Sequence, residues 1–219
     1  MKIQAVLFDM DGLMLDTERL TISAWDWAGE QLGFGPLGYL VFKTLGMNRQ
    51  GSEEVFRQEF GGRLTGDQLS AFTSQYFHEY FAKQGVPVKD GLFPLLAYLK
   101  EKGYRRCVVT STSEKTARAE LEQAGILPWF DGMVCGNMVT HGKPAPDIYL
   151  LAAERMGLEP AHCLALEDSP NGIRSAFAAG VNPVVIPDLV EPDEEILGKA
   201  VARLQSLAEV PALLEKLEK

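Results

Sequence analysis

The sequence predicts an α/β fold: a Rossmann-like parallel sheet core that carries an inserted α-helical cap domain. Five short apolar runs predict the strands, at residues 5–8, 107–109, 132–134, 163–166 and 184–186, and each run ends in small or acidic polar residues. Continuous apolar runs of this length are typical of strands buried on both faces. Stretches of helical length separate the later runs, and strands that alternate with helices favour a parallel sheet.

The helices between the later strands are predicted at residues 114–124, 146–156 and 170–179. Gly125, Gly157 and Gly180 follow them, at the position where a helix end prefers glycine. Residues 188–195 are acidic and contain Pro192, which predicts a solvated loop. The apolar spacing over residues 206–219 predicts a last helix that docks on the core.

The insertion is predicted because no comparable strand signal occurs between Gly12 and Val88. Helical spacing of apolar residues over 52–60 and 67–83 favours an all-helical module. We therefore expect residues 1–16 and 88–219 to form the catalytic core and residues 17–87 to form a cap over the carboxyl edge of the sheet.

Composition excludes several classes of protein. The 219 residues are 46% hydrophobic and 23% charged, as in ordinary globular proteins. No apolar run is long enough to span a membrane, and the N-terminus enters a strand-like run instead of a signal peptide, so a cytoplasmic location is expected. A net charge of -9 argues against nucleic-acid or membrane partners. Three isolated cysteines suggest buried thiols, and we expect a monomer.

Polar residues follow four of the predicted strands, at the edge where parallel sheets bind ligands. They are Asp9 and Asp11, then Ser111, then Lys143, then Glu167 and Asp168. Each alone has a structural alternative, since such residues also cap helices and make turns. Together they favour a site for Mg²⁺, which prefers oxygen ligands and usually keeps one or two carboxylates.

This ordered set resembles the haloacid dehalogenase superfamily, whose four motifs appear here as Asp9-Met10-Asp11-Gly12, Ser111, Lys143 and Glu167-Asp168. The sequence is most similar to the branch of phosphatases and β-phosphoglucomutase-like proteins with a helical cap. The resemblance implies that Asp9 is the nucleophile, Asp11 the acid and base, and Lys143 and Ser111 the groups that stabilise the transferring phosphoryl. It also implies Mg²⁺ as the cofactor, held by Asp9, by the backbone carbonyl of Asp11, by Asp168 and by Glu167.

The segment 44–52 resembles the substrate-specificity loop of this branch, and it contains Asn48 and Arg49. Arg49 is expected to bind substrate, with Ser113 and Lys115 on the core side of the same cleft. Two departures weaken a mutase interpretation: Thr21 stands where such mutases commonly have histidine, and a glutamate, at position 114, stands where they have lysine.

The leading hypothesis is a magnesium-dependent phosphatase that hydrolyses a small phosphorylated metabolite, such as a sugar phosphate, through an aspartyl-phosphate at Asp9. A hexose phosphomutase is the alternative within enzymes. A phospho-accepting signalling domain also places an acceptor aspartate, a hydroxyl and a lysine at parallel strand ends. Asp11 and the predicted cap argue against that domain, because they suit turnover of an enclosed small molecule.

Overall fold

A computed structural model describes residues 2–47 and 49–218. Its centre is a parallel sheet with the strand order β3-β2-β1-β4-β5-β6. The strands are β1 (Ala5–Phe8), β2 (Arg105–Thr110), β3 (Gly132–Cys135), β4 (Cys163–Glu167), β5 (Asn182–Val185) and β6 (Ala202–Arg203). The predicted α/β class is confirmed, and all five predicted strands occur, with ends shifted by a few residues. The short edge strand β6 has no apolar run and was not predicted.

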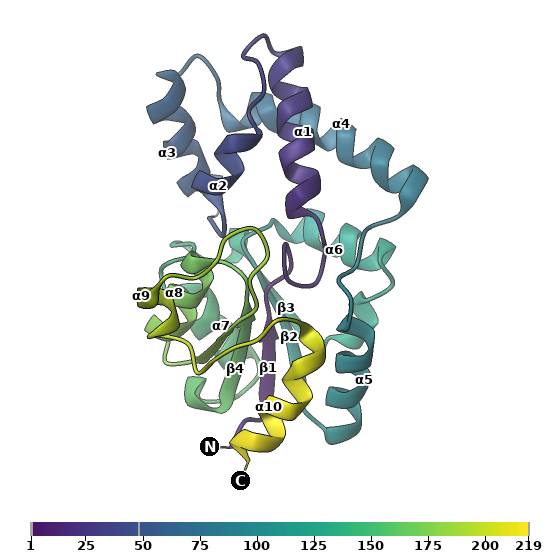
Figure 1. The fold of residues 1–219 in the computed structure, drawn as a ribbon, viewed down its shortest axis with the longest axis vertical. Helices are drawn as coiled ribbons and strands as arrows, with labels where there is room; N and C mark the ends of the chain where they lie inside the picture. Colours follow the sequence, from purple (N-terminus) through teal and green to yellow (C-terminus); the bar gives the residue numbers. More distant parts are fainter. Residues whose placement is uncertain (1, 48, 219) are drawn as a thin grey trace.

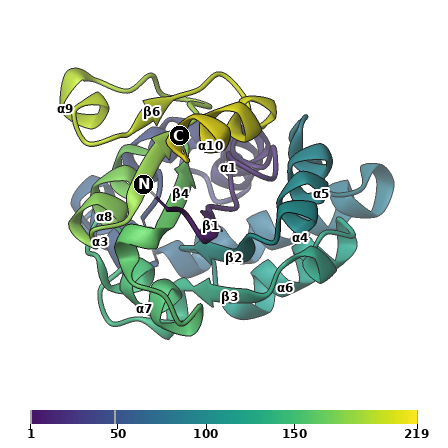
Figure 2. The ribbon, with the colours of Figure 1, turned by 90° about the horizontal axis from the view of Figure 1, so that it is seen from below.

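Helices cover both faces of this sheet, as Figure 2 shows from below. The core helices are α5 (Leu92–Lys102), α6 (Glu114–Gln123), α7 (Asp147–Arg155), α8 (Pro170–Ala178), α9 (Glu194–Leu197) and α10 (Val210–Leu217). Alternate residues of β1 serve opposite faces: Val6 and Phe8 join the apolar cluster of α5, α6 and α10, whereas Ala5 and Leu7 join that of α7 and α8. This alternation follows from the two-residue period of a strand, and it makes β1 the buried centre of the core.

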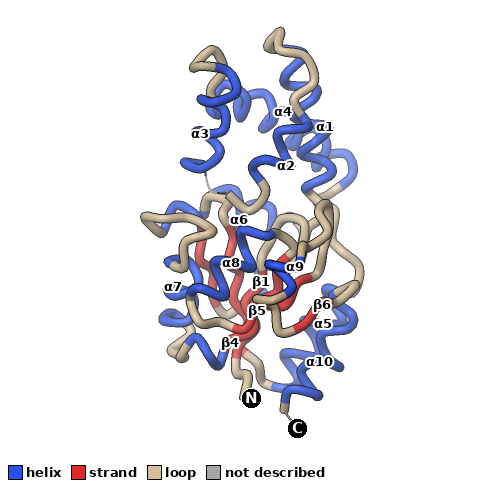
Figure 3. The backbone as a smooth tube through the Cα atoms, turned by 60° about the vertical axis from the view of Figure 1, so that its left-hand side comes forward, coloured by secondary structure: helices blue, strands red, loops and turns tan. Residues whose placement is uncertain are grey.

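Four further helices form a separate layer beyond the carboxyl edge of the sheet (Figures 1 and 3). They are α1 (Glu18–Gln31), α2 (Val41–Thr44), α3 (Arg49–Phe60) and α4 (Gly66–Gln84). An apolar cluster of their own, which includes Leu40, Phe56 and Leu69, holds them together. Thr65 begins α4 with a capping box, because its side chain accepts from Gln68 N while the Gln68 side chain accepts from Thr65 N.

The acidic segment after β5 is a loop up to α9 with several exposed residues, as its composition predicts, but Asp188 is not solvated. Asp188 has a side chain only 4% exposed, and it pairs with Arg19 and, at 2.8 Å, with Lys89. Lys89 also lies 2.8 Å from Asp16. Ion pairs of Asp188 and Lys89 therefore connect the core to the two segments that lead into and out of the helical layer. The sequence does not reveal that Asp188 is buried at this junction. Farther along, the Asp193 side chain caps α9.

Among the described residues, no helix combines the length and the apolarity that crossing a membrane would need.

Candidate active site

The predicted polar residues converge where β2, β1 and β4 end side by side. Asp9 directly follows β1, Ser111 directly follows β2, and Glu167 and Asp168 lie at the end of β4. Because β1 pairs in parallel with both β2 and β4, these side chains reach the same edge. Lys143 arrives from the loop between β3 and α7.

Lys143 is the buried charge at the centre of this edge, and its side chain has no exposed surface. Its Nζ donates to Asp9 Oδ1 at 2.5 Å, to Glu167 Oε1 at 2.6 Å and to the Val109 carbonyl at 3.1 Å. Burial alone would lower the pKa of Lys143, but the two carboxylates raise it above its ordinary value. The lysine is therefore a fixed cation.

Asp9 lies in the same buried environment, but burial acts on its pKa in the opposite direction. Burial raises the pKa of Asp9 to about 8, and the carboxylate of Glu167 adds to the rise, while Lys143 opposes it. One cation therefore does not fully compensate the negative charge here.

Glu167 is fully buried and surrounded by donors. Its Oε1 accepts from Lys143 and from the Tyr149 hydroxyl, and its Oε2 accepts from Ser169 Oγ at 3.2 Å. A Cβ on Gly172 would lie 1.8 Å from Glu167 Oε2, so only glycine leaves room for this carboxylate. The glutamate is thus held by protein donors and orients Lys143.

Asp168 is the carboxylate in this group that lacks such donors. It is 6% exposed, and among the described residues no hydrogen bond to its side chain is found. Burial raises its pKa well above the ordinary value, and the charges of Asp9 and Glu167 add to this. Ligand atoms of Asp9, Glu167 and Asp168 lie within 4.8 Å of one another.

This donor set fits a divalent cation that prefers oxygen. A buried carboxylate without a partner is costly unless a cation compensates it, and hard oxygen ligands suit Mg²⁺. Gly12 supports the fit: its φ is +82°, and a Cβ there would lie 2.3 Å from Asp168 Oδ2. The chain therefore passes close beside this carboxylate only because residue 12 is glycine.

Two hydroxyl groups hold the carboxylate of Asp11. Thr17 Oγ1 donates to Asp11 Oδ1 at 2.7 Å, and Thr112 Oγ1 donates to Asp11 Oδ2 at 2.9 Å. Thr17 precedes α1, but its side chain makes no capping hydrogen bond. The sequence left helix capping open for Thr17, and it placed Thr112 with Ser111 in a hydroxyl-rich segment that could bind an anion. It did not predict that either threonine holds Asp11.

Ser111 contacts the helical layer in this structure. Its Oγ donates to the Gly46 carbonyl at 2.9 Å, and Asn171 Nδ2 donates to the adjacent Leu45 carbonyl at 2.8 Å. Two side chains of the core thus hold the loop that follows α2 against the strand ends.

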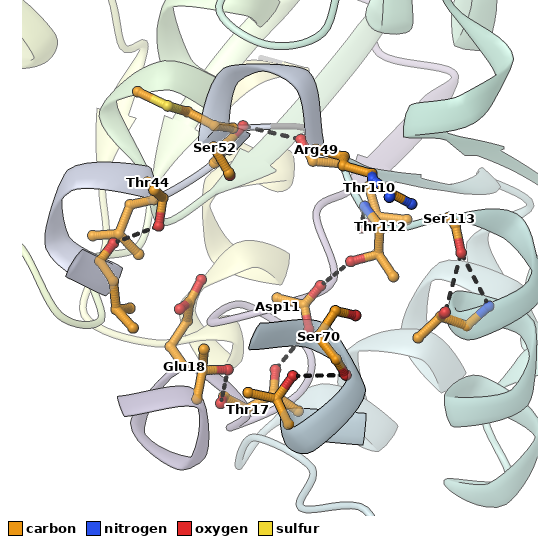
Figure 4. Close-up of a pocket in the computed structure, with 18 of the residues that line it drawn as sticks. Asp11, Thr17, Glu18, Thr44, Arg49, Ser52, Ser70, Thr110, Thr112 and Ser113 are labelled. Carbon is orange, nitrogen blue, oxygen red and sulfur yellow. Dashed lines mark hydrogen bonds between the residues drawn. The ribbon is translucent and has the colours of Figure 1, made fainter. Parts of the chain in front are cut away.

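A cavity of about 450 Å³ opens between the strand ends and the helical layer. Figure 4 shows part of its lining, with Asp11, Thr17, Glu18, Ser70, Thr110 and Thr112 around one space. The catalytic edge contributes Asp9, Asp168 and Ser111, while α1, α3, α4 and α6 supply the other walls. The predicted catalytic residues and the cavity therefore coincide, except that Lys143 lies behind Asp9.

Of the three predicted substrate-binding residues, two line the cavity and one does not. Arg49 lines the cavity but is exposed and pairs with Asp67 of α4. Ser113 lines the cavity and caps α6, accepting from Thr116 N. Lys115 is exposed and does not belong to the cavity lining. Asn48 of the predicted specificity loop lies outside the described residues.

Sequence reasoning missed two acidic residues of the wall, Glu18 and Glu120. Glu120 follows Ser113 and Thr116 at helical spacing, so all three share one face of α6. That spacing was the signal for Glu120. Glu18 belongs to the segment Asp16-Thr17-Glu18, which is similar to the same branch of the family, but the sequence assigned it no role in the site.

Comparisons with known proteins agree with this geometry. The profile of the haloacid dehalogenase-like hydrolases matches residues 3–180. Hexitol phosphatase A of Escherichia coli is 32% identical over 186 residues, which cover 85% of this chain and 84% of that protein. Fructose-1-phosphate phosphatase YqaB of the same organism is 32% identical over 184 residues, covering 82% and 94%.

Among solved structures, CbbY from Rhodobacter sphaeroides in complex with phosphate superposes with a TM-score of 0.80 at 30% identity, covering 95% of this chain and 96% of that one. Family profile, relatives and fold agree with the four strand-end motifs. The chain belongs to the haloacid dehalogenase-like hydrolases.

Proposed function

We propose that this protein is a magnesium-dependent phosphatase that hydrolyses a small phosphorylated metabolite, of the sugar phosphate class, through an aspartyl-phosphate at Asp9. The observation that carries the proposal is the position of Asp9: it faces the cavity, and Lys143 holds one of its oxygens at 2.5 Å. The named relatives, a hexitol phosphatase and a fructose-1-phosphate phosphatase, support the substrate class.

In this proposal the free oxygen of Asp9 attacks phosphorus. A bond from Asp9 to phosphorus forms as the bond from phosphorus to the leaving oxygen breaks, and Asp11 gives its proton to that oxygen. Asp11 then takes a proton from water, which attacks phosphorus and releases inorganic phosphate and the Asp9 carboxylate. Thr17 and Thr112 fix the orientation of Asp11 for both transfers.

Lys143 and Ser111 would stabilise the phosphoryl group during transfer. Lys143 is a permanent cation behind Asp9, and the Ser111 hydroxyl reaches the phosphoryl oxygens if it exchanges its bond to Gly46 for one to the substrate. Glu167 acts by orienting Lys143, because protein donors already engage both of its oxygens.

Asp9, Asp168 and the backbone carbonyl of Asp11 would hold the Mg²⁺. When bound, the ion neutralises charge on the phosphate and on the carboxylates around it. Asp168 without a hydrogen-bond donor, close to Asp9, supports this choice of ligands.

The hexose phosphomutase alternative is not favoured. Arg49, which falls where the mutases of this branch bind a second phosphate, pairs with Asp67. Glu114, at the position of a mutase lysine, pairs with Arg118 at 3.4 Å and lies outside the cavity lining. A signalling domain is also disfavoured, because Asp11 lies close to Asp9 and would speed the hydrolysis of an aspartyl-phosphate.

The test is release of inorganic phosphate from a panel of phosphomonoesters. With Mg²⁺ the wild-type protein should turn over sugar phosphates, chelation should stop turnover, and Asp9→Asn should abolish it. Exposed Asp90, on the chain that returns to the core, gives the matched control Asp90→Asn, which should keep full activity. Unchanged turnover in Asp9→Asn would refute the proposal.

A further inference from the structure

The wall of the cavity away from the strand ends is acidic and lacks free positive charge. Among the described lining residues the only basic side chain is Arg49, which Asp67 already neutralises. The lining acid Glu53 is also occupied, since its Oε2 accepts from Gly66 N at 2.8 Å. Arg49, Asp67 and Glu53 therefore leave no net positive charge to receive an anionic group.

Two other lining carboxyls have no such partner. Glu18 on α1 and Glu120 on α6 line the cavity from different sides, and no hydrogen bond or ion pair to either side chain is found among the residues that the structure describes. Lys89, whose charge acts on Glu18, is committed to Asp16 and Asp188.

Both carboxyls are close enough to Asp11 to respond to its charge. Burial raises the pKa of Glu18 to about 8, with the charges of Asp11 and Asp9 adding to it. Burial likewise raises the pKa of Glu120 to about 8, and Asp11 adds to it. Both carboxyls therefore favour the protonated form at neutral pH, and a cation between them would favour the ionised form.

The position of Asp11 indicates what occupies this space. In the proposed function, on which this inference rests, Asp11 protonates the leaving oxygen, so the leaving group lies beside Asp11. Glu120, on which the charge of Asp11 acts, therefore borders the leaving group. Glu18 borders the leaving group and also lies near Asp9 and Asp168, since charge acts between them.

The rest of this wall suits the same kind of group. Hydroxyls line it from α4, at Ser70, Thr73 and Ser74, and accept hydrogen bonds from an ammonium group. The Trp25 ring of α1 also lines the cavity, and the face of an indole attracts cations.

We propose that the cavity selects phosphomonoesters whose leaving group carries a protonated amine, with Glu18 and Glu120 as the residues that determine this specificity. An ammonium group finds two carboxyls, hydroxyls and an aromatic face. A second phosphate or a carboxylate on the leaving group meets two unpaired acids and no free cation, so such substrates are rejected.

The experiment compares substrates that differ in one group. One pair is 3-aminopropyl phosphate and 3-hydroxypropyl phosphate, in which the amine, like that of lysine, stays protonated at neutral pH. The second pair is glucosamine 6-phosphate and glucose 6-phosphate, and fructose 1,6-bisphosphate tests rejection. In at least one pair, kcat/KM should be higher for the amino member by about tenfold or more, the scale of one hydrogen bond to a charged group, and the bisphosphate should be the poorest substrate.

Variants then assign the preference to residues. Glu120→Gln and Glu18→Gln should each reduce the ratio of amino to hydroxy kcat/KM several-fold. Glu122 is exposed on the same helix, so Glu122→Gln is the matched control and should keep the wild-type ratio. If one cavity variant fails to fold, as circular dichroism would show, the other still tests the assignment.

The outcomes separate the two proposals. Hydrolysis of the hydroxy substrates at rates equal to or above the amino ones overturns the amine specificity and leaves the phosphatase intact. No phosphate release from any member of the panel removes the phosphatase and this inference with it. An amine preference that survives in both Glu18→Gln and Glu120→Gln overturns the role of these residues.

Discussion

Replacing Lys143 by methionine tests the electrostatic centre of the site. The change keeps an unbranched apolar side chain as far as Cε, with sulfur in place of one methylene, and removes the ammonium group that Asp9 and Glu167 share at 2.5 and 2.6 Å. Since this group is wholly buried, water cannot take its place without rearrangement. Breaking a buried ion pair by removing one partner costs about 3–5 kcal/mol of folding free energy, and we expect a loss in this range at neutral pH without metal.

The loss should depend on pH, with a sign that follows from Asp9. Its pKa in the folded protein is already raised to about 8, and losing Lys143 raises it further. The folded variant then binds a proton that the unfolded chain releases above about pH 4. Its stability therefore falls as pH rises. Wild type has the same Asp9 dependence up to about pH 8, so the deficit relative to wild type should be nearly constant near pH 6 and should grow near pH 9, above the wild-type pKa.

Urea unfolding at the two pH values measures this effect, and release of phosphate measures the catalytic one. Turnover should fall by about 10³ or more, because a donor to the transferring group is lost and Asp9 is no longer oriented. Lys115→Met, which alters an exposed lysine outside the cavity, should change stability by less than about 0.5 kcal/mol. A Lys143→Met protein with wild-type stability near pH 9 and turnover within tenfold of wild type would show that this reasoning is wrong.

Three further changes probe the packing and charges around the site. Gly172→Ala should lower the free energy of unfolding by about 3 kcal/mol, because the new Cβ would lie 1.8 Å from Glu167 Oε2. Asp188→Asn should cost about 2 kcal/mol in urea unfolding, because Lys89 loses a partner whose side chain is buried. Glu120→Gln should leave stability unchanged near pH 5 and raise it by about 2 kcal/mol near pH 9, because the wild-type carboxyl, with its pKa raised to about 8, binds a proton in the folded state and loses stability as pH rises.

Each of these changes has a control in the same chain. Gly198→Ala adds a Cβ that meets only its own helix, 3.3 Å from the Glu194 carbonyl, and should cost less than about 1 kcal/mol. Glu191→Gln removes an exposed pair with Arg203 and should change stability by less than about 1 kcal/mol. Glu122→Gln should show no pH-dependent gain. Equal effects in a test variant and its control would contradict the structural reason given for that variant.

The sheet could be predicted from the sequence because β1, β2 and β4 are buried on both faces, and continuous apolar runs mark such strands. The short strand β6 at the edge carries no such signal. Helix α1 was expected as part of an all-helical insertion, but its bounds were not predicted, since its apolar residues pack within the helical layer. Tertiary packing decided these elements.

The convergence of Asp9, Asp11, Asp168 and Lys143 at one edge could be predicted for a related reason. Parallel strands of one sheet end at a common edge, so a polar residue after each strand predicts a shared site before any coordinates exist. The sequence could not show how these residues divide their work. Glu167 and Asp168 are neighbours in the chain, yet their surroundings differ. Tyr149 of α7 and Ser169 at the start of α8 donate to Glu167. Beside Asp168 lies the turn at Gly12, and the described residues give this carboxylate no donor.

By itself, then, the sequence determined the fold class, the family and which polar residues meet at the carboxyl edge of the sheet, because these follow from local apolar patterns, from motifs and from strand order. Only the tertiary structure decided the charge of the cavity wall, where Arg49 pairs with Asp67 while Glu18 and Glu120 find no partner within residues 2–47 and 49–218. The physical reason is that pairing and desolvation depend on side chains brought together from distant segments, and no local pattern in the chain records which charges will meet.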